Sequence, residues 1–127
     1  MRKRIIVLSL LIILLAASIV YATSASFVRQ AGEFAASSVI TPRAGKFHGI
    51  LFTTDGTNTV TVSIYDNATA AAGNELIPTS YITSSAANRL SSISIDPPVK
   101  YHNGIYVHVA VAGGGAVSYM VYYEDDN

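Results

Sequence analysis

Three histidines, His48, His102 and His108, are the side chains of this sequence best suited to bind a metal ion. Zinc sites usually show closely spaced ligands, such as the two histidines of an HExxH helix. Here His48 and His108 fall in stretches predicted to be strands, and His102 falls in a predicted turn. The sequence therefore predicts solvated surface histidines and no metal site.

Serine nucleophiles and paired carboxylates are the other chemistry that this composition could supply. No GxSxG motif is present, and the serines alternate with Ile and Val, which is typical of the outer face of a strand. Asp55, Asp66 and Asp96 lie beside Gly, Asn or Pro, where a carboxylate commonly accepts hydrogen bonds from backbone N–H groups of a turn. A Ca²⁺ site built from Asp55 with Asn58, or from Asp66 with Asn67, lacks EF-hand spacing. We therefore expect no enzymatic activity and no cofactor.

Tyrosine is the one residue type that suggests a binding surface. Tyr offers a large apolar ring with a polar tip, which suits protein interfaces. Four tyrosines come from the last two predicted strands and are candidate interface residues: Tyr106, Tyr119, Tyr122 and Tyr123. In the alternative interpretation they are ordinary strand residues, with Tyr119 and Tyr123 partly in the core.

Two further motifs lie in predicted loops. Asn67-Ala68-Thr69 is an N-glycosylation sequon, so Asn67 is a candidate acceptor if the host glycosylates exported chains. Gly113-Gly114-Gly115 connects two predicted strands, which predicts a hairpin connection and excludes a phosphate-binding loop before a helix.

The charge distribution divides the chain into a leader and a body. Eight basic and eight acidic residues balance over 127 residues, but three of the basic ones are Arg2, Lys3 and Arg4, so five basic and eight acidic residues remain, a net −3. Such a body shows no basic excess for nucleic acid. The absence of Cys excludes a disulfide scaffold.

Residues 1–22 have the parts of a secretory signal peptide: the basic start, an uncharged apolar run over residues 5–20, and small residues before Thr23. The alternative is an uncleaved membrane anchor, because the apolar run is at the lower edge of the roughly 17–25 residues that span a bilayer. In both cases the positive-inside tendency places the body outside the cytoplasm. We expect an exported protein, extracellular or on a cell or virion surface.

The body is predicted to be all-β. Residues 23–35 are interpreted as a linker or arm, and residues 36–127 as one domain of about seven short strands. Predicted strands cover 38–41, 46–54, 59–65, 76–83, 89–95, 105–111 and 116–123, with Asp55-Gly56 as a hairpin turn, Asp96-Pro97-Pro98 as a stiff turn and residues 124–127 as an acidic tail. Pro78 favours an edge strand. This spacing predicts an antiparallel β-sandwich, jelly-roll-like, preceded by an N-terminal hydrophobic helix.

The order of these features resembles small β-sandwich structural proteins of bacteriophage and prophage virions. The resemblance runs from Ser38 to Tyr123 and is carried by SSVITPRAGK, FHGILFTTDGTN, VTVSIYDNATAAAGNEL, YHNGIYV and SYMVYY. It implies a non-enzymatic structural role, associated with a capsid or virion, and transfers no catalytic residue. The export leader departs from ordinary tailed-phage proteins, which assemble in the cytoplasm.

Three functions remain open. The first is a structural subunit of a virion or surface assembly, which associates with itself or other subunits through sheet edges and a Tyr-rich face, and with a membrane through residues 5–20 if the leader is retained. The second is a pilus-like extracellular filament subunit that donates residues 23–41 to a neighbour, with Phe27, Val39 and Ile40 as strand-forming residues. The third, a carbohydrate-binding module, is weakened by the absence of Trp.

Overall fold

The computed structural model describes residues 29–30, 33–83 and 85–126, which form an all-β fold. The leader and Phe27 lie outside these residues. The elements are β1 (Arg29–Gln30), β2 (Ser38–Thr41), β3 (Gly45–Thr54), β4 (Thr59–Asp66), β5 (Glu75–Thr83), β6 (Leu90–Tyr101), β7 (Ile105–Val111), the short 3₁₀ turn η1 (Ala112–Gly114) and β8 (Val117–Asp125). Within the described part of the chain, no helix is long and apolar enough to cross a membrane.

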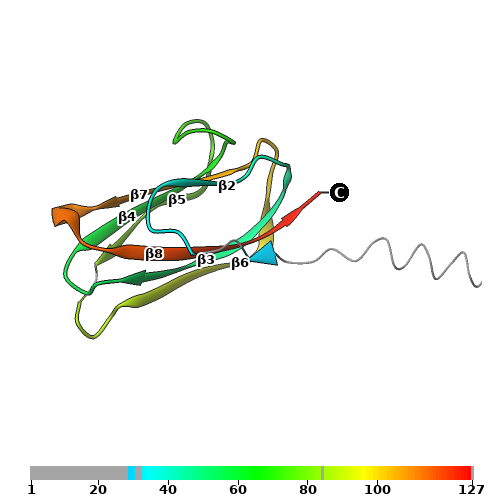
Figure 1. The fold of residues 1–127 in the computed structure, drawn as a ribbon. Helices are drawn as coiled ribbons and strands as arrows, with labels where there is room; N and C mark the ends of the chain where they lie inside the picture. Colours follow the sequence, from blue (N-terminus) through cyan, green and yellow to red (C-terminus); the bar gives the residue numbers. More distant parts are fainter. Residues whose placement is uncertain (1–28, 31–32, 84, 127) are drawn as a thin grey trace, which may run out of the picture.

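The strands form two antiparallel four-stranded sheets. Sheet 1 has the order β1-β8-β3-β6 and sheet 2 the order β2-β7-β4-β5. Figure 1 shows them as two layers, with β2, β7, β4 and β5 in one and β8, β3 and β6 in the other. The two layers determine which turns are hairpins, because consecutive strands belong to one sheet only at β4 and β5.

Two predicted hairpins are therefore wrong. The Asp55-Gly56 turn leads from β3 in sheet 1 to β4 in sheet 2, and Gly113–Gly115 leads from β7 in sheet 2 to β8 in sheet 1. Both connections are short, as their residue types predict, but a short turn can join strands of facing layers as well as neighbouring strands of one sheet. The one hairpin among the described strands joins β4 to β5 across the predicted loop of residues 67–74.

Alternate residues of β4 and of the first half of β7 are buried in the core. Val60, Val62 and Ile64 of β4 are fully buried, as are Ile105 and Val107 of β7. The buried cluster combines both sheets and contains Phe47, Ile50, Phe52, Val117, Tyr119 and Val121 from sheet 1 with Val60, Val62, Ile64, Leu76, Ile77, Ile105 and Val107 from sheet 2, together with Tyr101 at the end of β6. This burial removes apolar surface of both layers from water and supplies the main driving force for folding.

The predicted stiff turn at Asp96-Pro97-Pro98 is also wrong, because β6 continues through it to Tyr101. The register against β3 shifts there: Phe47 lies opposite Val99, but Gly49 lies opposite Ser94. The prolines are tolerated because β6 is an outer strand and bulges at this point. At the start of β6, Leu90 pairs regularly with Thr53.

The predicted linker and the predicted acidic tail both contribute residues to sheet 1. Within residues 23–35, interpreted as a linker or arm, Arg29 and Gln30 pair with Tyr123 and Tyr122 of β8. Phe34 forms a bridge with Tyr119, and their rings stack with centroids 5.6 Å apart. At the other end, Glu124 and Asp125 belong to β8, so the predicted acidic tail is wrong for these two residues.

Candidate functional site

The outer face of sheet 1 carries a hollow of about 330 Å³ where β3, β6 and β8 lie side by side. Gly49 of β3 lies opposite both Ser94 of β6 and Tyr122 of β8, so the face lacks a side chain at this point. Around it lie His48, Leu51, Ser92, Ser94 and Tyr122. The hollow thus lies where Gly49 leaves the outer face without a side chain, next to the register shift between Phe47 and Gly49.

Charged groups lie beside the hollow. His48 Nε2 is 3.0 Å from Glu124 Oε1 but is not oriented to form a hydrogen bond, and Lys46 Nζ is 3.3 Å from Glu124 Oε2. The serine and tyrosine hydroxyls that line the hollow make no hydrogen bond within the described part of the chain. This arrangement can offer hydroxyl groups and one aromatic ring to a ligand. Among the described residues, no three or more His, Asp or Glu side chains are grouped to hold a metal ion.

The outer edge of sheet 1 is the second feature able to bind a partner. Among the described strands, β6 pairs with β3 alone. In an antiparallel ladder, directly opposed residues alternate between hydrogen-bonded and non-hydrogen-bonded pairs. The bond from Thr54 N to Arg89 O (2.8 Å) shows that Thr54 and Arg89 form a hydrogen-bonded pair, so every second pair after it is hydrogen-bonded as well. The backbone groups of Ser91 and Ile93 therefore bond to β3. Those of Leu90, Ser92 and Ser94 point to the open side.

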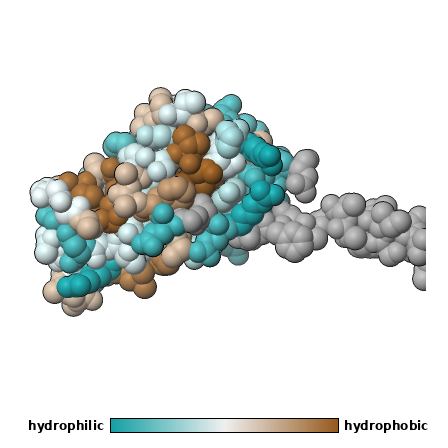
Figure 2. All heavy atoms as spheres, in the orientation of Figure 1, coloured by the Kyte–Doolittle hydropathy of each residue, from teal (hydrophilic) through white to brown (hydrophobic). Residues whose placement is uncertain are grey.

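This open edge lacks the usual protection. Residues 90–95, which we call the β6 edge segment, carry neither charge nor proline, and Leu90 is 60% exposed. The other outer strands are less suited to pairing: β1 has two residues, β2 has four with a register shift, and β5 contains Pro78. Figure 2 shows apolar residues at separate places among polar ones on the face seen there.

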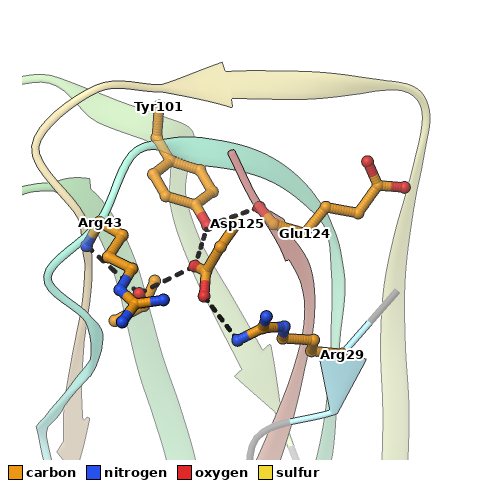
Figure 3. Close-up of polar contacts among 6 residues, drawn as sticks. Arg29, Arg43, Tyr101, Glu124 and Asp125 are labelled. Atoms are coloured by element: carbon orange, nitrogen blue, oxygen red, sulfur yellow. Dashed lines mark hydrogen bonds and ion pairs between the residues drawn. The ribbon is translucent and has the colours of Figure 1, made fainter. Parts of the chain in front are cut away.

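A polar network closes the end of the fold where β8 finishes (Figure 3). Asp125 Oδ2 accepts a hydrogen bond from Arg29 Nη1 (2.9 Å), and Oδ1 accepts one from Thr41 Oγ1 (2.9 Å). The Tyr101 hydroxyl donates to the Glu124 carbonyl (2.8 Å) and lies 3.3 Å from Asp125 Oδ1. Because Thr41 belongs to sheet 2 and the others to sheet 1, the network ties the two sheets together. The Asp125 side chain is only 4% exposed.

Alkaline pH is expected to destabilise the protein through this network. Burial, then the charge and hydrogen bond of Asp125, raise the pKa of Tyr101, and burial raises the pKa of Tyr119. A raised folded-state pKa means that the stabilisation is complete below the unfolded value, about 10, and is lost above it. Tyr101→Phe should therefore reduce the fall in unfolding free energy above pH 10 by about 1.4 kcal/mol per pH unit. Urea unfolding between pH 9 and 11.5 measures it; an unchanged slope contradicts the assignment.

The four candidate tyrosines do not share one face. Tyr119 is 1% exposed in the core, where its hydroxyl donates to the Ala36 carbonyl (2.7 Å), and Tyr123 packs against the core. The alternative interpretation of these two residues is confirmed. Tyr106 and Tyr122 alternate with buried neighbours and therefore face outward, but from different sheets. Only Tyr122 contributes to the hollow.

The other candidate residues are placed separately. Val39 is 41% exposed and Ile40 packs against the core; both lie on β2, which pairs with β7 of the same chain. Asn67 lies in the β4–β5 loop, as predicted. Its Oδ1 accepts bonds from the backbone N of Thr69 (2.8 Å) and Ala70 (3.2 Å), so the sequon forms a local turn.

The aspartates shape turns, but not only locally. Hydrogen bonds from Thr57, first its backbone N and then its hydroxyl, hold the pKa of Asp55 below its ordinary value, and Ala116 N adds a bond across the chain (2.9 Å). Asp66 Oδ1 accepts bonds from His102 N (2.9 Å) and Asn103 N (2.6 Å), which joins the end of β4 to the β6–β7 turn. The purely local role predicted for Asp66 is wrong.

Sequence reasoning missed the two features with the clearest structural roles, the Asp125 network and the open edge of β6. The signal for Asp125 was weak, because an acidic residue near a chain end is usually solvated. The sequence of the β6 edge segment, LSSISI, shows that it lacks charge and proline. Its position at the edge of a sheet depends on the sheet order, which the sequence does not show.

Over the described residues, the fold is that of an all-β protein of two antiparallel four-stranded sheets, in which β6 is an outer strand with an uncharged segment at residues 90–95. A comparison with protein-family models, curated proteins and solved structures finds no match.

Proposed function

We propose that this chain is a non-enzymatic structural subunit of a virion or an extracellular surface assembly. The observation that carries the proposal is the open, uncharged edge of β6, where the backbone groups of Leu90, Ser92 and Ser94 have no partner strand within the described part of the chain. An exposed edge of this kind is a template for pairing with another chain. Its occupation by a neighbouring subunit explains why it is left without a charge or a proline.

The strand pairing supports a jelly roll as the finer description of the fold. Each strand of the first half pairs with its counterpart in the second half: β1 with β8, β2 with β7, β3 with β6 and β4 with β5. This nested order is that of a long hairpin rolled into two facing sheets, a sandwich of the kind found in viral capsid and lectin domains. It fits the expected relation to virion-associated proteins.

The leader supports an exported location. With a cleavable signal the subunit is released outside the cytoplasm; with a retained leader, residues 5–20 hold it at a membrane. Its partners are then further copies or other structural subunits, and not nucleic acid. An assembly outside the cytoplasm or on a membrane-containing virion accommodates both forms of the leader.

The two alternative functions have less support. The donor-strand filament requires residues 23–41 to pair with a neighbour, whereas β1 and β2 pair with β8 and β7 of their own chain. A carbohydrate-binding module is favoured only by the hollow on sheet 1, where Tyr122 is the one aromatic ring. A sugar site of that class needs a stacking surface, and a single half-buried tyrosine offers a small one.

Fractionation of the producing cells and their particles tests the structural role. We expect the full chain in purified particles or surface assemblies, at a copy number comparable with other structural proteins, and in large complexes after gentle extraction. A chain recovered only as a free monomer in the medium, and absent from every particle preparation, contradicts the proposal.

A further inference from the structure

We propose that the β6 edge segment pairs with the same segment of a second copy, antiparallel and centred on Ser92. This inference deepens the proposed structural role, on which it rests, by naming the partner and the register. It follows from the phase of the ladder, the charge pattern of the segment and the composition of the other edges.

The alternation of paired and unpaired backbone groups along β6 makes the segment complementary to a second copy of itself. The free backbone groups belong to Leu90, Ser92 and Ser94, which are spaced two residues apart about Ser92. A two-fold axis at Ser92 places Ser92 opposite Ser92 of the second copy and Leu90 opposite its Ser94. In an antiparallel ladder each such pair exchanges two hydrogen bonds, about six in all, so every free group of the segment gains a partner.

The charge pattern favours the antiparallel arrangement. The first charges outside the segment are Arg89 at one end and Asp96 at the other. Antiparallel pairing brings Arg89 of each copy toward Asp96 of the other, whereas parallel pairing places like charges side by side. Natural edge strands often carry charged residues, which repel a second copy and prevent self-pairing. The β6 edge segment carries no charge of this kind.

The proposed pairing between the two copies ends where β6 itself becomes irregular. After Ser94 the ladder between β3 and β6 is interrupted, and Pro97 and Pro98 offer no backbone donor. The pairing is therefore limited to one short segment, which permits a discrete two-fold contact and opposes open-ended growth of the sheet. On the outer face, Leu90 gains a neighbour in Ser94 of the second copy, which covers part of its exposed surface.

Cysteine cross-linking of the full chain tests the register, because the natural sequence contains no Cys. Directly opposed residues in this kind of pair have Cα atoms about 5.5 Å apart, within the range of about 4.4–6.8 Å that a disulfide bridges. We expect Ser92→Cys to form covalent dimers on mild oxidation. Leu90→Cys mixed with Ser94→Cys should give mixed dimers in higher yield than either variant alone, and Thr53→Cys, exposed on a central strand, should give none.

Introducing a charge at the contact provides the second measurement. Ser92→Lys places two like charges at the two-fold axis and should weaken self-association at least about tenfold in sedimentation experiments. At a dilution where both variants are monomeric, its melting temperature should equal that of the matched variant Thr53→Lys, which should leave self-association at higher concentration unchanged. Self-association unaffected by Ser92→Lys, or Thr53→Cys cross-linking as well as Ser92→Cys, overturns the proposal.

The outcomes separate this inference from the proposed function. A chain present in particles without Ser92→Cys cross-links retains its structural role and loses the β6 contact. Cross-linked dimers of a chain that is absent from every assembly retain the contact and overturn the structural role.

Discussion

Asp125→Ala should lower the free energy of unfolding by about 3 kcal/mol, a large effect for a polar residue near the end of a strand. The carboxylate is almost completely buried and accepts hydrogen bonds from Arg29 and Thr41, with the Tyr101 hydroxyl close by. Hydrogen bonds to a charged group contribute about 1.5–3 kcal/mol each, and truncation leaves the Thr41 hydroxyl without its acceptor. The loss corresponds to a melting temperature lower by roughly 15 °C.

Asp126→Ala is the matched control, because it removes the same group from an adjacent and exposed position. Its effect should lie within about 0.5 kcal/mol of zero. Arg29→Ala should cost about 1 kcal/mol at most, since the arginine side chain is half exposed and an exposed ion pair contributes little. Urea unfolding monitored by tyrosine fluorescence measures all three. Equal losses for Asp125→Ala and Asp126→Ala would show that the network does not hold the sheets together.

Gly104→Ala is the second substitution with a large expected effect, about 3 kcal/mol or more. Gly104 has a φ of +121°, which L side chains rarely adopt, and an added Cβ would meet the Thr41 carbonyl and lie 3.1 Å from Pro42 Cα and 3.2 Å from Ala68 Cα. The strain of such a backbone costs about 1–3 kcal/mol, and overpacking against backbone atoms adds a similar amount. The turn cannot relax freely, because Asp66 holds its neighbours His102 and Asn103.

Gly114→Ala separates the two causes. Gly114 also has a positive φ, +78°, but an added Cβ would meet no atom within 4 Å. Its replacement should cost only the backbone strain, about 1 kcal/mol. Thermal unfolding of both variants by circular dichroism measures the difference. A Gly114→Ala loss as large as that of Gly104→Ala would mean that strain alone, and not contact with the Thr41–Ala68 region, limits the β6–β7 turn.

The strands and their inward faces were accessible to sequence reasoning. The predicted stretches 38–41 and 105–111 coincide with β2 and β7, and the alternating Val60, Val62 and Ile64 of the predicted strand 59–65 are buried in β4. Alternation works here because a strand's two faces are set by a period of two, which is a local property of the chain. Pro78 likewise indicated that β5 is an outer strand, because proline cannot donate to an interior ladder.

Pairing was not accessible in the same way. The turns at Asp55-Gly56 and at Gly113–Gly115 have hairpin composition, yet each crosses from one sheet to the other. A turn's residue types specify the backbone dihedral angles of a few residues, whereas the partner of a strand depends on how two distant apolar faces are buried together. The same limit hid the candidate site, because the β6 edge segment is open only by virtue of the sheet order.

The sequence by itself determined that this protein has an apolar basic leader, a mildly acidic body without Cys, and short strands with defined inner faces. Only the tertiary structure decided that β6 is open, that Asp125 is buried among Arg29, Thr41 and Tyr101, and that the tyrosines are divided between core and two outer faces. The physical reason is that composition and alternation act over neighbouring residues. An open edge or a buried carboxylate is created by residues up to about a hundred positions apart, as with Arg29 and Asp125, whose separation is 96.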